Sequence, residues 1–383
     1  MGREYHAIVV GAGPAGCAAA YDLASAGRSV LLLDRRHFPR VKPCAGALTI
    51  KTLKALRYSV APVIREVVTD FAAGNGWSEV NILRGPGPVC VLTVRSEFDS
   101  YCLQRTVEAG VEFKSISDWA GIEQSSSHVS ISSSDGVFRS RFLIGTDGAN
   151  SQVRRFCAGA GWSFNGFAIE VDCAHPGSKV DLEFDFGIVD GGYAWVFPKR
   201  DHVNVGLFTY KPGKALSRGA LEEYRKRKLG TAAIGPVRGH NVGLGGFAYK
   251  PSGRVLLAGD AAGFADALFG EGIYNAIRSG QAAASSICNE LDERVPAAAG
   301  YAERLAEIQS DAASCYRAAV KFYRNVDAGY ARLISPVVRR AVMKGYAMGL
   351  TFTETRKWFL LLPLVPIWET RSRGGLEAAF GRV

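Results

Sequence analysis

Three glycines near the N-terminus constrain the fold of this chain more than any other feature. Gly11, Gly13 and Gly16 have the spacing GxGxxG, follow the apolar run HAIVV and precede a segment of small apolar residues typical of a buried helix. The run RSVLLLD then predicts a second strand that ends at Asp34, eighteen residues after Gly16. This order of strand, glycine turn, helix and strand over residues 6–34 predicts a βαβ unit that binds a dinucleotide.

Each glycine has a separate physical role in such a unit. Gly11 permits the tight turn, Gly13 lets the backbone approach a pyrophosphate, and Gly16 lets the helix and strand pack closely. The helix N-terminus offers unpaired N–H groups and partial positive charge to the phosphates, and Asp34 would accept hydrogen bonds from ribose hydroxyls. The spacing alone is weak evidence in a chain with 44 glycines, but its context makes a chance turn the poorer interpretation.

Later segments decide which dinucleotide is expected. In chain order they are Asp34-Arg35-x-x-x-Pro39-Arg40-x-Lys42-x-Cys44-x-Gly46, Arg95-Ser96-x-Phe98-Asp99, Gly145-x-Asp147-Gly148-Ala149-x-Ser151-x-Val153-Arg154, and Gly259-Asp260-Ala261-Ala262-Gly263. With the glycine turn, this set resembles the FAD-binding signature of the flavoprotein monooxygenase-like superfamily. Within it, KPCAG (42–46), GYAWVFP (192–198) and GEGI (270–273) are similar to segments of the geranylgeranyl reductase family, so the resemblance covers residues 6 to about 285.

The resemblance implies a mixed α/β fold. A Rossmann-like FAD-binding domain would carry an inserted antiparallel-sheet substrate domain and be followed by a C-terminal helical region. The FAD-binding domain would be assembled from three separate segments, residues 1–72, 95–160 and 251–298. Between them would lie substrate-domain strands (73–94) and the antiparallel-sheet substrate domain itself (161–250), and a basic helical region (299–383) would end the chain.

The resemblance also implies a set of cofactor-binding residues. They are Gly11, Gly13, Ala15, Gly16, Asp34, Arg35, Cys44, Ala45, Gly46, Arg95, Asp147, Gly148, Asp260, Gly272 and Ile273. The nucleotide portion of FAD would be contacted by Ala15, Asp34, Arg35 and Arg95, and the flavin by Cys44, Ala45 and Gly46. Asp260 would lie near the ribityl-diphosphate.

Gly272 and Ile273 would meet the isoalloxazine through their backbone N–H groups. A helix predicted over residues 273–284 would aim its positive end at the flavin N1/C2 region, where reduced flavin is anionic. A purely structural role is the alternative for two of these sites: Asp260 would then be a helix N-cap, and Asp147-Gly148 would form a turn. Two departures from the family pattern are Asp34, which is shorter than the usual Glu, and Ala45, which stands where glycine is common and narrows the space beside the flavin.

Cys44, Tyr193, Trp195 and Phe197 are the candidate catalytic residues. The three aromatics alternate with Ala194 and Val196, so a strand would place all three rings on one face. An aromatic wall suits a long apolar substrate and a developing cation, although the same pattern also fits an ordinary core face. Cys44 would shape the flavin region, position the substrate or supply a proton, or be a small buried hydrophobe.

The activity that the resemblance implies is reduction of carbon–carbon double bonds in a prenyl or polyprenyl chain of a lipid or quinone. An isolated alkene is not electrophilic, so protonation to a tertiary cation would be coupled to hydride delivery from reduced flavin. The electron donor stays open between NAD(P)H and a ferredoxin-type protein. The alternatives are a flavin-dependent monooxygenase or halogenase acting on an aromatic or apolar substrate, and a membrane-associated flavoprotein that senses or relays electrons.

Positive charge is concentrated near the C-terminus. From Arg317 to Val383, twelve Lys and Arg face four Asp and Glu, so this segment carries +8 of the formal net charge of +10. Such a segment suits an anionic membrane surface, and the alternative is a solvated face of a helical domain. No nucleic-acid-binding motif accompanies the charge, so nucleic acid is not an expected partner.

The cysteines bear on the compartment and on metals. Eight are scattered without a CxxC pair or metal-ligand spacing, which predicts free thiols, no metal and a cytoplasmic location. The basic C-terminal segment adds the expectation of a peripheral position on the inner face of the membrane. The longest apolar run, FLLLPLVPIW (359–368), is shorter than the roughly twenty residues that a bilayer-spanning helix needs.

Overall fold

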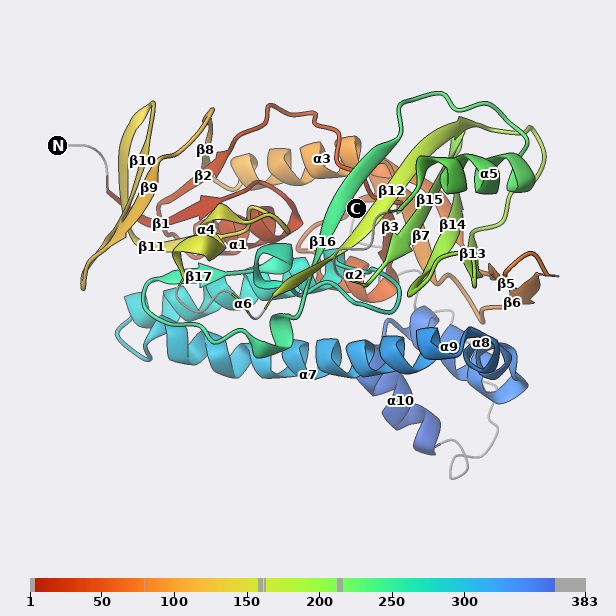
Figure 1. Cartoon of the computed structure of the whole chain (residues 1–383). Helices are drawn as coiled ribbons and strands as arrows, with labels where there is room; N and C mark the ends of the chain where they lie inside the picture. Colours follow the sequence, from red (N-terminus) through yellow and green to blue (C-terminus); the bar gives the residue numbers. More distant parts are fainter. Residues whose placement is uncertain (1–3, 79, 158–160, 162, 212–215, 362–383) are drawn as a thin grey trace. The chain divides into compact units, whose positions relative to one another are not determined.

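The computed structural model describes residues 4–78, 80–157, 161, 163–211 and 216–361 (Figure 1). The chain packs into two compact units, each assembled from three stretches of sequence. The first unit consists of Met1–Val41, Ser96–Asn165 and Asn241–Ala313, and the second of Lys42–Arg95, Gly166–His240 and Ser314–Val383. The functional domain boundaries predicted from the sequence stay a prediction.

A mixed sheet forms the centre of the first unit. Its strand order is β8-β2-β1-β11-β10-β9, and β17 pairs with β11. β8, β2, β1, β11 and β17 pair in parallel, whereas β9 and β10 pair antiparallel. The bounds are β1 Glu4–Val10, β2 Val30–Asp34, β8 Glu112–Ser115, β9 Gly121–Gln124, β10 Val129–Ser133, β11 Gly136–Gly145 and β17 Val255–Leu257. β2 is buried over its apolar length, as expected for a parallel strand that helices cover.

Helices of this unit pack closely where their residues are small. The helices are α1 Pro14–Ser25, α3 Arg95–Glu108, α4 Gln152–Phe156, α6 Ile273–Leu291 and the beginning of α7 Ala297–Arg324. An added Cβ at Gly280 of α6 would lie 2.3 Å from the carbonyl oxygen of Ala15 of α1, so the two backbones nearly touch. This contact ties the start of α1 to α6.

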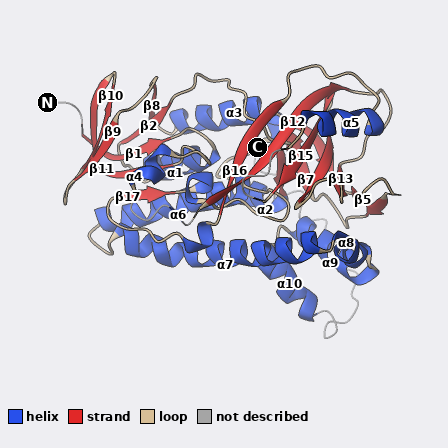
Figure 2. Ribbon diagram, in the orientation of Figure 1, coloured by secondary structure: helices blue, strands red, loops and turns tan. Residues whose placement is uncertain are grey.

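A larger sheet dominates the second unit. Its order is β16-β12-β15-β14-β13-β5-β6, and α5 lies over one of its faces (Figure 2). The bounds are β5 Phe71–Asn75, β6 Asn81–Leu83, β12 Phe164–Ala174, β13 Glu183–Phe186, β14 Gly192–Pro198, β15 His202–Thr209, β16 Arg238–Leu244 and α5 Arg218–Lys228. Alternate residues of β12, β14 and β15 pack against Leu221 and Tyr224 of α5 and form an apolar core. The other face of these strands is therefore free to carry different residues.

Smaller elements complete the second unit. A three-stranded sheet has the order β3-β7-β4, with β3 Ala47–Thr49, β4 Ile64–Val68 and β7 Cys90–Thr93. Its helices are α2 Ile50–Ala55, the end of α7, α8 Val326–Ile334, α9 Pro336–Met348 and α10 Phe352–Leu361. Short 3₁₀ helices at Ala61–Val63 in this unit, and at Gly246–Ala248 and Gly259–Ala262 in the first, connect the larger elements.

The mixed α/β fold predicted from the sequence is confirmed. The βαβ unit predicted over residues 6–34 is present. The sequence also predicts a helix over 95–108 and a basic helix over 214–229, and these are α3 and, within the described residues, α5. The antiparallel pairing predicted within residues 161–250 is present in β12, β15, β14 and β13. β13 also pairs in parallel with β5, which lies outside that segment. One element prediction is wrong: the sequence predicts only glycine-rich connectors between the basic helix and residue 254, and these contain β16.

Helix length and the grouping of polar side chains bear on membranes and metals. Within the described ranges, no helix is both long and apolar enough to cross a bilayer, and no group of His, Cys, Asp and Glu could hold a metal ion. The cysteines are free thiols. Most of the apolar run 359–368 and the basic residues Arg371, Arg373 and Arg382 lie outside the described residues.

Candidate functional site

The glycine turn is held against the end of β11 in the first unit. Gly11 has φ +105°, and an added Cβ would lie 2.5 Å from the carbonyl oxygen of Thr146. The Thr146 hydroxyl donates to the carbonyls of Val10 (2.8 Å) and Gly11 (2.7 Å), which fixes the turn. At Gly16 an added Cβ would lie 1.8 Å from the Gly11 carbonyl, so only glycine allows this helix to start here.

Helix α1 begins without a side-chain cap. Its N-cap is Gly13, which makes no side-chain capping bond, and an added Cβ there would meet only the Arg40 guanidinium at 3.6 Å. The first turn of α1 therefore has no side-chain cap, and the Arg40 guanidinium lies beside its N-cap residue. Backbone N–H groups, helix dipole and guanidinium together make a site suited to a pyrophosphate.

Asp34 closes the turn from the end of β2. Its Oδ2 accepts from the amide of Ala12 at 2.7 Å, and its Oδ1 accepts from the amide of Arg36 at 2.8 Å. A carboxylate has about four acceptor positions, so both oxygens keep capacity for the hydroxyls of a ribose. Arg35, beside it, is exposed to solvent.

Arg40 is a residue to which the sequence motif assigned no role. Its Nη2 lies 3.0 Å from Oδ2 of Asp99, whose side chain is fully buried. Because a buried carboxylate needs a partner, Asp99 orients the guanidinium next to Gly13. The signal was present in the PR pair that follows Asp34, but the partner Asp99 lies 59 residues further along the chain.

A second uncapped helix N-terminus lies in the same unit. α6 has Gly272 as its N-cap, again without a side-chain bond, and Ile273 is its first residue. Asp260, in the 3₁₀ turn after β17, approaches this end, since an added Cβ at Gly272 would lie 3.2 Å from Asp260 Oδ1. An added Cβ at Gly259 would lie 3.0 Å from Ala15, so this turn also abuts the start of α1.

Asp147 caps α4. It accepts from the Ser151 hydroxyl (2.5 Å) and from the amides of Gln152 (2.7 Å) and Val153 (3.2 Å), and its burial raises its pKa. Arg154 then donates to the carbonyl oxygens of Asp260 (3.3 Å) and Ala261 (3.0 Å). The segment therefore has a demonstrated structural role, and cofactor contacts from Asp147 and Gly148 stay a prediction.

The predicted flavin-lining segment Cys44–Gly46 lies in the second unit. Gly46 has φ +72°, and its carbonyl accepts from the Thr93 amide (2.8 Å) and hydroxyl (3.0 Å) on β7. The Gly46 amide donates to Cys44 Sγ at 3.4 Å, and the ammonium group of Lys199 donates to the Ala45 carbonyl at 2.5 Å. Arg95, also assigned to the cofactor, is buried at the start of α3.

The three aromatics of β14 share one face of the large sheet, as the alternation predicts. They join a cluster with Phe184 and Phe208: the Phe184 ring centroid is 5.3 Å from those of Tyr193 and Phe197, and Tyr193 is 5.4 Å from Phe208. All three rings are buried, with 4–6% of their surface exposed. This burial fits both a substrate wall and a core face, so their catalytic role stays a prediction.

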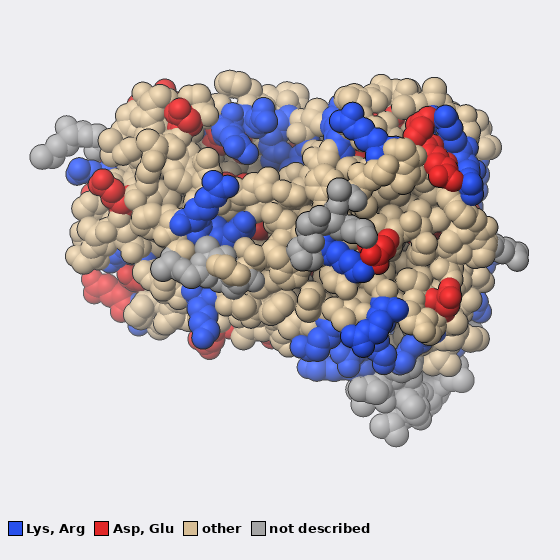
Figure 3. All heavy atoms as spheres, viewed as in Figure 1, with Lys and Arg blue, Asp and Glu red and all other residues tan. Residues whose placement is uncertain are grey.

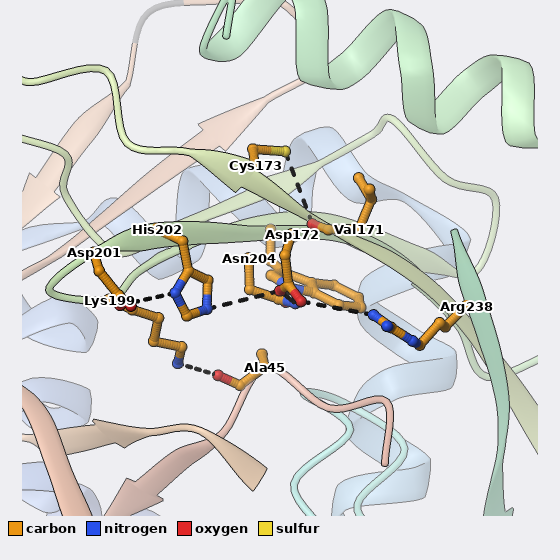
Figure 4. Close-up of polar contacts among 10 residues, drawn as sticks. Ala45, Val171, Asp172, Cys173, Lys199, Asp201, His202, Asn204 and Arg238 are labelled. Carbon is orange, nitrogen blue, oxygen red and sulfur yellow. Dashed lines mark hydrogen bonds and ion pairs between the residues drawn. The ribbon is translucent and has the colours of Figure 1, made fainter. Parts of the chain in front are cut away.

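A polar group adjoins these rings on the same face. Trp195 Nε1 donates to Asn204 Oδ1 at 2.8 Å, and Asn204 Nδ2 donates to Asp172 Oδ1 at 2.9 Å (Figure 4). His202 (3.8 Å) and Arg238 (3.7 Å) lie at the outer side of Asp172. Polar side chains therefore lead from solvent-accessible Asp172 to the indole of Trp195.

Glu170 and Lys199 are buried titratable groups that reasoning from the sequence missed. Glu170 is 7% exposed, and burial together with the negative charge of Asp172 raises its pKa to about 7. Lys199 is 3% exposed, and burial lowers its pKa to about 8. A usable signal was the IEVD stretch of β12, where two acids two residues apart interrupt an apolar strand.

Comparisons with known proteins agree with this geometry. A family model described as an FAD binding domain matches residues 4–174. The chain is 30% identical over 315 residues to the geranylgeranyl diphosphate reductase of Rhodobacter capsulatus, covering 77% of this chain and 78% of that protein. It is 31% identical over 326 residues to digeranylgeranylglycerophospholipid reductase 2 of Methanopyrus kandleri, covering 76% and 78%.

Solved structures share the fold at lower identity. A geranylgeranyl bacteriochlorophyll reductase-like protein from Thermoplasma acidophilum matches with a TM-score of 0.66 at 20% identity, over 99% of this chain and 96% of that one. A flavin-dependent brominase matches with a TM-score of 0.73 at 17% identity, over 94% of this chain and 100% of that one. At such identities the likeness establishes the fold alone.

Proposed function

We propose that this chain, which belongs to the geranylgeranyl reductase family of FAD-dependent oxidoreductases, reduces carbon–carbon double bonds in a prenyl or polyprenyl chain of a lipid or quinone. The observation that carries the proposal is the buried aromatic face of the large sheet, which adjoins acidic side chains. An isolated trisubstituted alkene needs a proton and a hydride, and such a face can shelter the cation formed between the two transfers.

FAD would be held by the first unit. The uncapped start of α1, Gly13 and Arg40 would receive the pyrophosphate, and Asp34 would accept from the ribose. The uncapped start of α6 would favour negative charge on the flavin ring, since a helix N-terminus carries about half a positive charge. When bound and reduced, FAD supplies the hydride.

The second unit would hold the substrate. The rings of Tyr193, Trp195 and Phe197 offer faces to a prenyl chain and exclude water. Cation–π attraction from a desolvated ring amounts to about 2 kcal/mol, which would lower the barrier to forming a tertiary cation by a similar amount. Cys44, anchored with Ala45 and Gly46 on β7 and Lys199, would shape this region and position the substrate.

An anaerobic assay tests the proposal. The purified holoprotein is reduced with dithionite and incubated with prenylated glycerolipids, prenylquinones and prenyl diphosphates, and products are measured by mass spectrometry. We expect products heavier by two hydrogen atoms for each reduced bond. Incorporation of oxygen or halide in air would instead support a monooxygenase or halogenase, and tightly bound FAD without turnover on any of these compounds would support an electron-relay role. The same assay with NAD(P)H or a reduced ferredoxin identifies the donor.

We also propose that the C-terminal helices bind an anionic membrane surface. Lys321 and Arg324 at the end of α7, with Arg339 and Arg340 of α9, are exposed, and Val337 nearby is 58% exposed. Figure 3 shows Lys and Arg side chains gathered over these helices. Each basic residue near such a surface contributes about 1 kcal/mol. Co-sedimentation with phosphatidylglycerol vesicles should weaken with salt and in Arg339→Ala/Arg340→Ala, whereas equal binding to neutral vesicles would contradict the proposal.

A further inference from the structure

We propose that Glu170 is the proton donor to the double bond and that Lys199 positions this carboxyl group and returns a proton to it. The inference rests on the proposed reduction and deepens it, because it assigns the proton to one side chain. It follows from three features of the second unit: the strand register, the hydrogen bonds of Glu170, and the charges around it.

The strand register places Glu170 beside the aromatic row. Glu170 of β12 and Trp195 of β14 are both paired with Gly206 of β15, and Trp195 is paired with Phe184 of β13. Residues paired across an antiparallel sheet share a face, so Glu170, Trp195 and Phe184 stand in one row. The row has no side chain at Gly206, and the indole covers that glycine: an added Cβ would lie 2.0 Å from Trp195 Cζ2. Glu170 and Trp195 are therefore neighbours along this row, separated only by Gly206.

The hydrogen bonds of Glu170 tie it to the KPCAG segment. Hydrogen bonding from the Cys44 backbone and from the side chain of Asn204, which also accepts from Trp195, lowers the pKa of Glu170. Lys199 holds the next residue of the same segment through the Ala45 carbonyl. Glu170 and Lys199 thus act on adjacent residues of one loop segment, which leads into β3.

The surrounding charges leave Glu170 able to give up a proton near neutral pH. Asp172 and Lys199 act on Glu170, and the thiols of Cys44 and Cys90 act on Lys199. His202 and Arg238 lie near Asp172, at 3.8 and 3.7 Å. Burial and Asp172 raise its pKa to about 7, while Lys199 and the two hydrogen bonds oppose the rise. A general acid works best when its pKa lies near the working pH.

The step balances in atoms and electrons. The O–H bond of the Glu170 carboxyl breaks as a C–H bond forms at the less substituted alkene carbon, which leaves a tertiary cation beside Trp195. Reduced FAD, when bound, would supply the hydride that the cationic carbon needs, so the alkene would gain two electrons and the flavin would lose two. The Glu170 carboxylate then takes a proton from the Lys199 ammonium, which regains one from water through the polar side chains around Asp172.

The decisive comparison is Glu170→Gln against Glu183→Gln. Glu183, on β13, is also mostly buried (14% of its side chain is exposed) and bonds to Lys228 at 2.6 Å, but it lies on the opposite face of the same sheet. In anaerobic stopped-flow with the prereduced holoprotein, Glu170→Gln should slow flavin reoxidation by a prenyl substrate by about 10²- to 10⁴-fold. FAD content should be unchanged, and Glu183→Gln should react like wild type.

A pH series separates acid catalysis from a structural role. The wild-type rate should fall above a pH of about 7, where Glu170 loses its proton. Asp172→Asn removes a charge that raises the Glu170 pKa, so the fall in rate should occur at lower pH. Lys199→Met removes a charge that lowers the Glu170 pKa, so the fall in rate should occur at higher pH. If Glu170 only holds the Cys44 segment, neither substitution should move the pH at which the rate falls. This comparison does not require the Glu170→Gln protein to fold.

Infrared titration gives a readout without turnover. The protein without substrate should show a protonated-carboxyl band that titrates near neutral pH and is missing in Glu170→Gln but present in Glu183→Gln. Full activity of Glu170→Gln would overturn the inference. It would also be overturned if Cys44→Ser lost proton transfer while Glu170→Gln kept it. Inactivity of the wild type on every prenyl compound, with the infrared band present, would instead refute the proposed reduction.

Discussion

Adding one methyl group at Gly206 should strain the row that carries Trp195. In Gly206→Ala the new Cβ would lie 2.0 Å from Cζ2, 2.3 Å from Cη2 and 2.5 Å from Cε2 of the Trp195 ring, so the indole must move. Overpacking costs about 1–3 kcal/mol, and a buried N–H that loses its 2.8 Å bond to Asn204 costs about 1–3 kcal/mol more. The lower chain entropy of alanine in the unfolded state offsets about 0.4–1 kcal/mol. We expect a net loss of about 2–4 kcal/mol.

The assay is urea unfolding followed by tryptophan fluorescence, with Gly121→Ala as the matched control. Gly121 is also a strand glycine, on β9, and an added Cβ there would meet nothing within 4 Å, so its stability should stay within about 0.5 kcal/mol of wild type. Trp195→Phe should relieve most of the strain, giving a favourable coupling energy in a double-mutant cycle. A Gly206→Ala protein as stable as wild type would refute the packing argument for this row.

Three further predictions concern the cofactor and substrate residues. Asp34→Ala removes a charge-assisted bond to Ala12 and should weaken FAD binding by about 10- to 100-fold, measured by fluorescence titration of the apoprotein. Arg40→Met removes the 3.0 Å ion pair to the fully buried Asp99 and should lower the free energy of unfolding by about 3–5 kcal/mol, with recovery in Arg40→Met/Asp99→Leu. Trp195→Ala should reduce turnover much more than FAD content; equal loss of both would assign the ring a structural role.

Local patterns predicted much of the fold. The βαβ unit and α3 are encoded by apolar runs, glycine turns and helical periodicity within about thirty residues, and the structure has them where the sequence places them. The alternation in β14 likewise predicted a single aromatic face. Pairing between distant strands has no such local signal. β5 and β13 pair in parallel across more than a hundred residues, and β16 was hidden because Gly239 and Gly243 resemble loop residues.

In the candidate site too, residues defined by a local pattern were predictable and residues defined by long-range contacts were not. Gly11, Gly16 and Asp34 were predictable because their spacing within one βαβ unit is a local pattern, although the distant Thr146 also holds the turn. Arg40 and Lys199 were not, since each acquires its role from a partner far along the chain: Asp99 for one, the Ala45 carbonyl for the other. A motif identifies which residues are unusual, but long-range pairing decides which charged side chains become buried.

The energetics of the Glu170–Lys199 region argue that it serves more than packing. Burying a carboxyl group and an ammonium group costs several kcal/mol per ion, and a well-packed apolar pair of similar volume is often as stable or more so. The opposite face of the same strands shows that this sheet can bury an apolar core, formed by Val171, Val196 and Val205 with α5. That opposite face also buries Glu183 and Asp185, which Lys228 neutralises at 2.6 and 2.9 Å. The polar side chains beside Trp195 lie instead in the row of the candidate catalytic rings, which is the placement that the proposed proton transfer requires.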